Sequence, residues 1–333
     1  SFPTRRSSDL SKTLRNFKLC LNQPIHCGNL VKFLEEISRN PYIQDIKLIL
    51  TGIASTADIP YNLHQIPSKI SHFSCHRMTG EDTFWVMKFV TRMAELRTLI
   101  LKGLNDNKII NDFVTFAEEI RSLPHLETIE YDFPRIKCYS EDVAKIIHTG
   151  KSVKNFSFSF EYIDVNSGQT PSTYESDADL ERLTLKCYFS IGEQIKRWLQ
   201  RQVFSGCSNL RFLHIHDTGS HNQFWIRYIF EVIYHLGNLE ELHIVGKRLG
   251  YGSDRRVYLS SHERLKVLSI KQSDKQIYYI DEYEYMGTFL SALVRLQKIS
   301  ITLFTRSLSD AMREIICLKS LEEIEIIHNQ FTP

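Results

Sequence analysis

The sequence predicts an α/β solenoid, in which about twelve short parallel strands lie side by side and helices occupy the connections between them. Three observations support this prediction. A short phrase with apolar residues at its first, fourth and sixth places recurs from end to end. Successive phrases begin 25 to 31 residues apart. Helical patterns fall between the phrases and not within them. Nearly constant spacing is typical of repeat proteins, in which each repeat adds one structural unit.

The phrase is clearest in two stretches, which begin at Leu210 and Leu239 and are separated by 29 residues. Each reads Leu-x-x-Leu-x-Ile, and a helical pattern lies between them. The twelve leading residues are Leu14, Ile43, Ile70, Leu96, Leu126, Val153, Leu180, Leu210, Leu239, Leu265, Leu296 and Leu321. On composition alone, on the order of twenty windows would match this apolar template. The regular spacing therefore carries the prediction, together with a second regularity: the residue after the leading one is polar in all twelve phrases.

Helices are expected in the connections, where apolar residues recur at a spacing of three or four. Pro124 suits the end of one of these helices. In chain order the expected helices are Leu30–Ile37, Phe84–Met93, Ile110–Leu123, Asp142–His148, Ile191–Val203, Phe224–Leu236, Tyr285–Leu293 and Asp310–Ile316. Three polar or glycine-rich stretches, Thr51–Pro60, Asp164–Ala178 and Gly246–Asp254, are expected to form loops instead.

The first ten residues, Ser1–Leu10, differ in character from the rest of the chain and resemble a translated sequencing adapter. We therefore expect residues 1–10 to be non-native and residues 11–333 to form one solenoid. On this interpretation a further domain precedes these residues in the natural reading frame.

Composition excludes several classes of protein. Forty-one Lys and Arg residues balance 39 Asp and Glu residues, so the net charge of +2 offers no general attraction for nucleic acid or for an anionic membrane. No apolar run has the length of a membrane span. Seven scattered cysteines show no C-x-x-C pair, which favours a reducing compartment, the cytoplasm or the nucleus.

The phrase resembles the leucine-rich repeat, whose pattern adds Asn or Cys three residues after the last Leu. Asn22 and Asn329 occupy that place, and Thr51, Thr218 and Ser273 offer hydrogen-bonding side chains there. The resemblance covers Leu14 to Asn329. Repeats of this length with helices are similar to the intracellular classes, found in ribonuclease inhibitor and in F-box substrate receptors. The resemblance implies a horseshoe solenoid of about twelve repeats, with a parallel sheet on the concave face and helices on the convex face.

Strand residues alternate between faces, so the third, fifth and seventh places of each phrase are expected to face outward. Ser159, Ser269, Ser300 and Thr302 are among these displayed positions. One group combines aromatic, guanidinium and imidazole side chains, which are typical of binding hot spots. We predict that this group binds a partner: Arg182, Lys186, Phe212, His214, His216, Glu241 and His243. A shorter acidic group, Glu130 and Asp132, is typical of solvated surface.

Catalytic and metal-binding sites are not indicated. His214, His216 and His243 have a spacing that zinc could use, but adjacent histidines on a polar sheet need no metal. Cys75 lies at an inward apolar place, which favours a core residue over a nucleophile. The glycine-rich phosphate loops and the usual hydrolase and metalloprotease motifs are absent from the sequence. We expect a protein that is not an enzyme and that needs no cofactor and no metal.

The resemblance therefore implies a protein-interaction module. On the favoured hypothesis the chain recognises a protein substrate on its concave face for an SCF-type ubiquitin ligase. The F-box that would bind the ligase's adaptor subunit is not recognisable in the sequence, and on this hypothesis it lies upstream. The alternative is a leucine-rich repeat scaffold or inhibitor with no role in ubiquitin transfer. A metal-dependent enzyme built on the three histidines is the remote third interpretation.

Overall fold

The computed structural model shows a leucine-rich repeat solenoid whose main sheet contains twelve parallel strands, one from each phrase. The order of these strands in the sheet is their order in the sequence. The structure describes residues 14–21, 25–49, 53–55, 69–78, 86–103, 110–120, 122–148, 152–164, 179–188, 197–219, 224–247, 249–250, 262–272, 290, 292–303, 312–313 and 315–328. The prediction of the fold class is confirmed, and residues 1–10 lie outside the described part.

The chain divides into two compact units, residues 1–137 with 145–160 and residues 138–144 with 161–333. Every strand of the main sheet begins two residues after the leading residue of its phrase. In the first half of the sequence these strands are β1 (Asn16–Cys20), β3 (Asp45–Ile49), β5 (His72–Met78), β6 (Thr98–Gly103), β7 (Thr128–Tyr139) and β8 (Asn155–Asp164). In the second half they are β9 (Arg182–Tyr188), β10 (Phe212–Asp217), β12 (Glu241–Gly246), β14 (Val267–Gln272), β15 (Lys298–Leu303) and β16 (Glu323–His328).

Alternation along each strand builds the core. In β10 and β12 every second residue is buried, and Leu213, Ile215, Leu242 and Ile244 are fully shielded from solvent. Burial of one such side chain contributes roughly 1.5–3 kcal/mol. The leading residues are buried in the ten inner phrases but only half-buried at Leu14 and Leu321. The outermost repeats have a neighbouring repeat on one side only among the described strands, which accounts for this difference.

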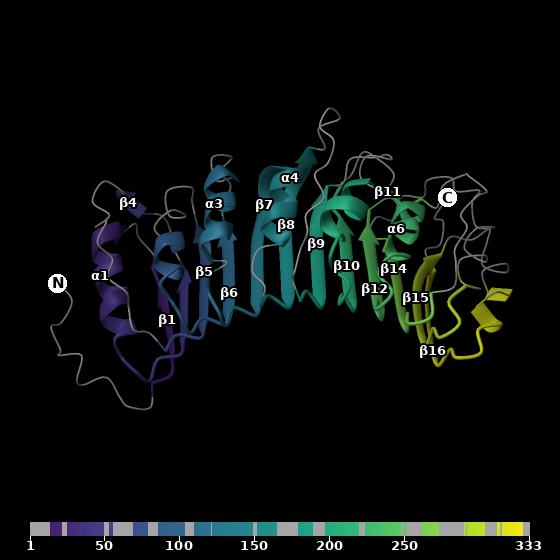
Figure 1. Cartoon of the computed structure of the whole chain (residues 1–333), viewed down its shortest axis with the longest axis horizontal. Helices are drawn as coiled ribbons and strands as arrows, with labels where there is room; N and C mark the ends of the chain where they lie inside the picture. The colour runs from purple at the N-terminus through teal and green to yellow at the C-terminus, as the bar shows by residue number, and fades with distance from the viewer. Residues whose placement is uncertain are drawn as a thin grey trace. The chain divides into compact units, whose positions relative to one another are not determined.

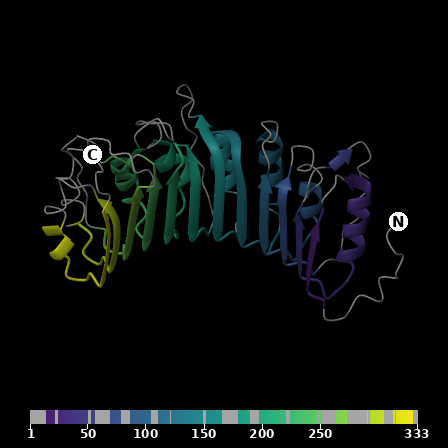
Figure 2. The same cartoon turned by 180° about the vertical axis from the view of Figure 1, so that it is seen from behind.

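Four α-helices that lie wholly within the described residues occupy connections between these strands: α1 (Cys27–Ser38), α3 (Ile110–Ile120), α4 (Ser140–Ile147) and α6 (Ile226–Ile233). Their apolar residues recur at helical spacing and face inward, as Leu30, Leu34 and Ile37 do in α1. Phe33 of α1 packs on Phe17 of β1, with ring centroids 5.7 Å apart. Figures 1 and 2, which are opposite views, show α3 and α6 on one side of the strands of their own units.

Several connections differ from the predictions. Phe224–Trp225 form a short strand, β11, which pairs with β13 (Leu249–Gly250), so α6 begins only at Ile226. β2 (Ile25–His26) and β4 (Ile53–Ser55) form a second small sheet. β4 and β13 lie within stretches that were expected to be loops. In the remaining expected loop, residues 165–178 lie outside the described part of the chain.

The expected helix Ile191–Val203 is described only from residue 197 onward, and Leu199–Val203 form a π-helix, η2. The N–H of Phe204 donates to the carbonyl of Leu199, 2.8 Å away. Donor and acceptor are five residues apart in the sequence, which is the separation that defines a π turn. The remaining expected helices are described in part: residues 86–90, 290, 312–313 and 315–316 are helical.

The second residue of each phrase combines a backbone that is hydrogen-bonded to the neighbouring repeat with a side chain that is exposed or half-buried, which suits a polar residue. The N–H groups of Glu240 and Glu241 both donate to the carbonyl of Arg211, at 2.8 and 2.9 Å. The same arrangement joins Glu127 and Thr128 to Arg97, at 2.9 Å each. The backbone of the second residue therefore extends the sheet, while its side chain stays at the solvated edge.

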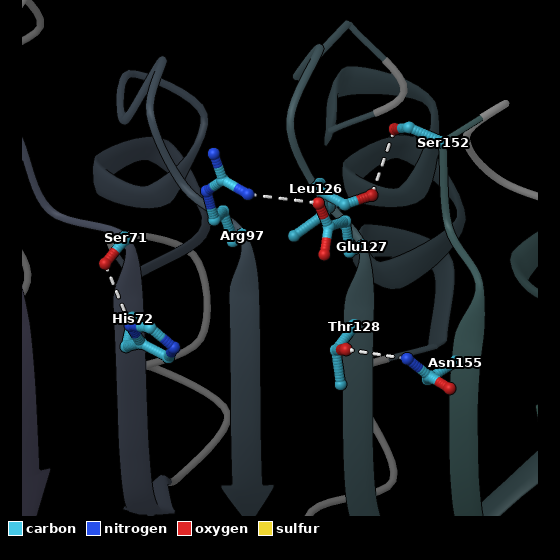
Figure 3. Close-up of polar contacts among 8 residues, drawn as sticks. All are labelled: Ser71, His72, Arg97, Leu126, Glu127, Thr128, Ser152 and Asn155. Atoms are coloured by element: carbon cyan, nitrogen blue, oxygen red, sulfur yellow. Dashed lines mark hydrogen bonds and ion pairs between the residues drawn. The ribbon is translucent and has the colours of Figure 1, made fainter.

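Figure 3 shows polar contacts along this edge in the first unit. Nη1 of Arg97 lies 3.2 Å from Oε1 of Glu127, and Oγ of Ser152 donates to the carbonyl of Leu126 at 3.0 Å. Between β7 and β8, Nδ2 of Asn155 donates to Oγ1 of Thr128 at 3.2 Å. Each of these contacts links successive repeats, whose equivalent residues are about 28 positions apart in sequence.

Candidate functional site

Three neighbouring strands of the second unit, β9, β10 and β12, carry all seven residues of the predicted site. The parallel register places Phe212 between Arg182 and Glu241, and it places His214 between Thr184 and His243. All seven side chains share one face, because they occupy alternate positions whose neighbours point into the core. We call this group the β9–β12 patch: Arg182, Lys186, Phe212, His214, His216, Glu241 and His243.

The patch contains a stack of a guanidinium group, a benzene ring and an imidazole. Cζ of Arg182 lies 3.9 Å from the centroid of the Phe212 ring, which is a cation–π distance. On the next strand the His243 ring has its centroid 5.1 Å from that of Phe212. The planar groups of three successive strands thus restrict one another before any partner arrives, so that less conformational entropy remains to be lost on binding.

The histidines of the patch lie close together but do not converge on a common point. The ring centroids of His214 and His216 are 6.2 Å apart and their planes differ by 11°. His243 lies 6.1 Å from His214 at a steeper angle, and its Nε2 is 3.5 Å from Oε2 of Glu241.

Burial lowers the pKa of His214 from its ordinary value of 6.5 to about 4, and the neighbouring His243, His216 and Lys186 act in the same direction. Nε2 of His214 is shielded from solvent and has no hydrogen-bond partner among the described residues. The pKa of His216 is also lowered, first by burial and then by Lys186 and Lys247. At neutral pH both imidazoles are therefore uncharged.

Metal binding by these histidines is not supported by their geometry. Zinc holds imidazole nitrogens at about 2.0–2.1 Å, so its ligand rings converge on one point. Within the described part of the chain, no group of three or more His, Cys, Asp and Glu side chains is arranged to hold a metal ion.

The described helices also include none that is long and apolar enough to cross a membrane.

Some positions that were expected to be displayed are buried. Ser159, Ser269, Ser300 and Thr302 have the predicted outward register, but 3–7% of each residue is exposed. Ser300 donates its hydroxyl hydrogen to Oε2 of Glu325, and the Thr302 hydroxyl accepts the N–H of Gln272 at 3.2 Å. The prediction that these four residues are displayed on the surface is wrong.

Charged residues outside the patch form ion pairs that the phrase alone did not reveal. On the same face of the second unit, Lys271 lies 3.2 Å from Glu325 and Lys298 lies 2.6 Å from Glu323. In the first unit, Lys102 pairs with Glu130 at 2.5 Å. The strand register could have suggested the Lys298–Glu323 and Lys102–Glu130 pairs, since each joins residues on the same face of adjacent strands.

Cys75, which the sequence places in the core, is found there, and so are Trp198 and Cys207. Cys75 is fully buried in β5. Trp198 is 2% exposed and donates its Nε1 hydrogen to the carbonyl of Ser140, 2.8 Å away. Burial raises the pKa of the Cys207 thiol to about 12, so this group is protonated at neutral pH. These residues stabilise the fold and take no part in the patch.

Comparison with known proteins leaves the family open. No family model matches the chain, and no curated protein matches it. Among solved structures it is similar to a plant peptide hormone receptor, RGFR1 in complex with RGF2, with 13% sequence identity and a TM-score of 0.25. That alignment covers 95% of this chain and 63% of the receptor chain. The fold itself is established by the strand order and register of the main sheet.

Proposed function

We propose that this chain is a protein-interaction module, without catalytic activity of its own, that binds a protein partner through the β9–β12 patch. The observation that carries the proposal is the stack of Arg182, Phe212 and His243 on the outward face of the sheet. Aromatic and guanidinium groups dominate the energetics of many protein interfaces. Because these groups are held on rigid strands, they favour a partner whose surface is complementary to them in shape.

The register of β9, β10 and β12 supports a contiguous interface, because it makes lateral neighbours of residues about 30 positions apart. The strands beneath the patch have their backbone groups hydrogen-bonded within the sheet. A partner therefore meets side chains, and recognition depends on their chemistry. This is the arrangement by which solenoid proteins build extended binding surfaces.

For the finer function, we propose that the partner is a protein substrate of an SCF-type ubiquitin ligase and that the ligase's adaptor subunit joins the same complex. The support is the resemblance of the repeats, by length and helical content, to the substrate-recognition part of F-box receptors. A scaffold or inhibitor without a ubiquitin role is the alternative. Either role fits a cytoplasmic or nuclear protein that needs no cofactor.

A comparison of two double variants tests the binding proposal. Phe212→Ala with His214→Ala removes an aromatic ring and an imidazole from the patch. The matched control, Tyr234→Ala with His235→Ala, removes the same two kinds of ring from an exposed turn after α6. Tagged versions of the unmodified chain and of both variants are expressed in cells, and the bound proteins are quantified by mass spectrometry.

We expect one or more proteins to be depleted at least about tenfold with the patch variant and retained with the control variant. Both variants should melt within a few degrees of the unmodified chain. If the patch variant, still folded, retained all bound proteins, the β9–β12 patch would have no role in binding.

A search of the bound proteins for the ligase adaptor separates the two finer roles. Co-purification of the adaptor together with the partner of the patch is the result expected for a ubiquitin ligase receptor. If the adaptor is absent while the partner of the patch is present, the scaffold or inhibitor role is favoured.

A further inference from the structure

The charges on the exposed sheet face of the second unit are distributed unevenly. On β14 and β15, Lys271 and Lys298 pair with Glu325 and Glu323 of β16. On β9, Arg182 and Lys186 are exposed, and no carboxylate of the described residues forms an ion pair with either. Within the described residues, the lysines of β14 and β15 are therefore paired with carboxylates, while Arg182 and Lys186 of β9 are in no ion pair.

The contact that holds the guanidinium group of Arg182 in place does not use its hydrogen-bond donors. Its guanidinium group lies over the Phe212 ring, so one planar surface is covered while the N–H groups at the edge remain available. Such a group is suited to bind a carboxylate with two parallel hydrogen bonds. The stack with Phe212 reduces the freedom that the side chain would lose on binding.

Lys186 provides a second cation at a defined distance. It lies four residues beyond Arg182 on the same face of β9, which corresponds to about 13 Å along a strand. Its neighbour on β10 is His216, and the pKa of this imidazole is lowered by burial, by Lys186 and by Lys247. At neutral pH Lys186 is therefore the charged member of this pair, and His216 is neutral.

We propose that the partner of the β9–β12 patch is an acidic protein segment that lies extended along β9 and places two carboxylates, four residues apart, on Arg182 and Lys186. The spacing follows from geometry, since residues four apart in an extended chain are also about 13 Å apart and share one face. This inference rests on the proposed function and adds to it the chemical class of the partner.

A displayed library of random dodecapeptides, selected on the immobilised 333-residue chain, is the probe that tests this inference. The test variant is Arg182→Glu with Lys186→Glu. The control variant, Lys32→Glu with Arg39→Glu, changes the net charge equally at exposed positions within α1 and directly after it. The Phe212→Ala, His214→Ala variant is included to detect binding to the patch that does not depend on charge.

The expected result is enrichment of peptides with Asp or Glu at positions four apart. Their binding should fall at least about tenfold with the β9 variant and stay within about twofold with the α1 variant. Binding should also weaken as the salt concentration rises from about 0.05 to 0.3 M, because exposed charges are screened.

Two results would overturn the inference while leaving the proposed function in place: peptides that depend on Phe212 and His214 but carry no acidic excess, and acidic peptides that bind the β9 variant as well as the unmodified chain. A selection that enriches no peptide on the unmodified chain beyond the Phe212→Ala, His214→Ala variant would count against the proposed function itself and would overturn the inference with it.

Discussion

The guanidinium carbon of Arg182 lies 3.9 Å from the centroid of the Phe212 ring, although the two residues are 30 positions apart in the sequence. Their strands are adjacent and in register, with Arg182 directly opposite Phe212. This pair joins the repeat architecture to the proposed function, because it exists only if one repeat stacks on the next. The coupling energy of this pair, the stability that the core beneath it provides and the pKa of His214 beside it can each be measured.

We expect Arg182 and Phe212 to be energetically coupled. In a double-mutant cycle with Arg182→Ala and Phe212→Ala, the coupling free energy of unfolding should be about 0.5–1 kcal/mol, the usual value for an exposed cation–π pair. The same cycle with Lys186→Ala in place of Arg182→Ala should give a coupling near zero. Urea denaturation of the purified variants measures both quantities. Equal coupling in the two cycles would show that the stack has no specific energy.

Leu242→Asp should destabilise the fold severely, because Leu242 is fully buried in β12 and a carboxylate there would lack both water and a partner. We expect a loss of about 4 kcal/mol or more in the free energy of unfolding. Arg211→Asp, at an exposed position two residues before Leu213, is the control and should change stability by less than about 1 kcal/mol. Thermal denaturation followed by circular dichroism distinguishes the two. An unchanged melting temperature for Leu242→Asp would contradict the strand register.

His214 should make stability depend on pH in the acidic range. Its pKa is about 4 in the folded chain and near 6.5 when the chain is unfolded. Below pH 6.5 the unfolded chain binds a proton that the folded chain does not bind, so stability falls as the pH decreases toward 4 and this contribution levels off below that value.

A His214→Gln variant isolates this contribution, because carboxylates that titrate in the same range are common to both proteins. We expect the unmodified chain to lose more stability than the variant between pH 6.5 and pH 4, as measured by chemical denaturation at each pH. An NMR titration of the His214 ring should show no protonation at pH 6. Parallel stability curves for the two proteins would contradict the lowered pKa.

Trp198→Phe should lower the free energy of unfolding by about 1–3 kcal/mol, because the buried carbonyl of Ser140 loses the hydrogen bond from Nε1 while the aromatic volume is largely kept. The measurement is urea denaturation followed by the fluorescence of the remaining tryptophans. A variant as stable as the unmodified chain would mean that this hydrogen bond makes no net contribution to the free energy of unfolding.

Much of the repeat architecture could be predicted because its signals are local. A strand alternates its side chains with a period of two, so the apolar places of each phrase identify the buried face without knowledge of any neighbour. The twelve leading residues located all twelve strands of the main sheet. The same alternation assigned the seven residues of the β9–β12 patch to one face, where the structure finds them.

The connections were less predictable, because their structure depends on contacts with other repeats. Phe224 and Trp225 fit a helical pattern, but β13 provides a strand with which they pair. Ser269 and Ser300 likewise occupy outward places of the phrase, yet only 7% and 3% of these residues, respectively, is exposed. At Gly103, a β-carbon would lie 2.3 Å from Cδ1 of the Phe133 ring, a close approach that no pattern in the phrase indicates.

By itself, the sequence determined that this protein is a stack of strand-containing repeats, where each strand lies and which of its side chains turn away from the core. Only the tertiary structure decided which of those side chains meet: that Arg182 rests on Phe212, that Lys271 pairs with Glu325 and that Lys298 pairs with Glu323. The physical reason is that alternation is a property of the backbone of one strand. Contacts across strands, by contrast, depend on the length, charge and conformation of side chains about 30 residues apart.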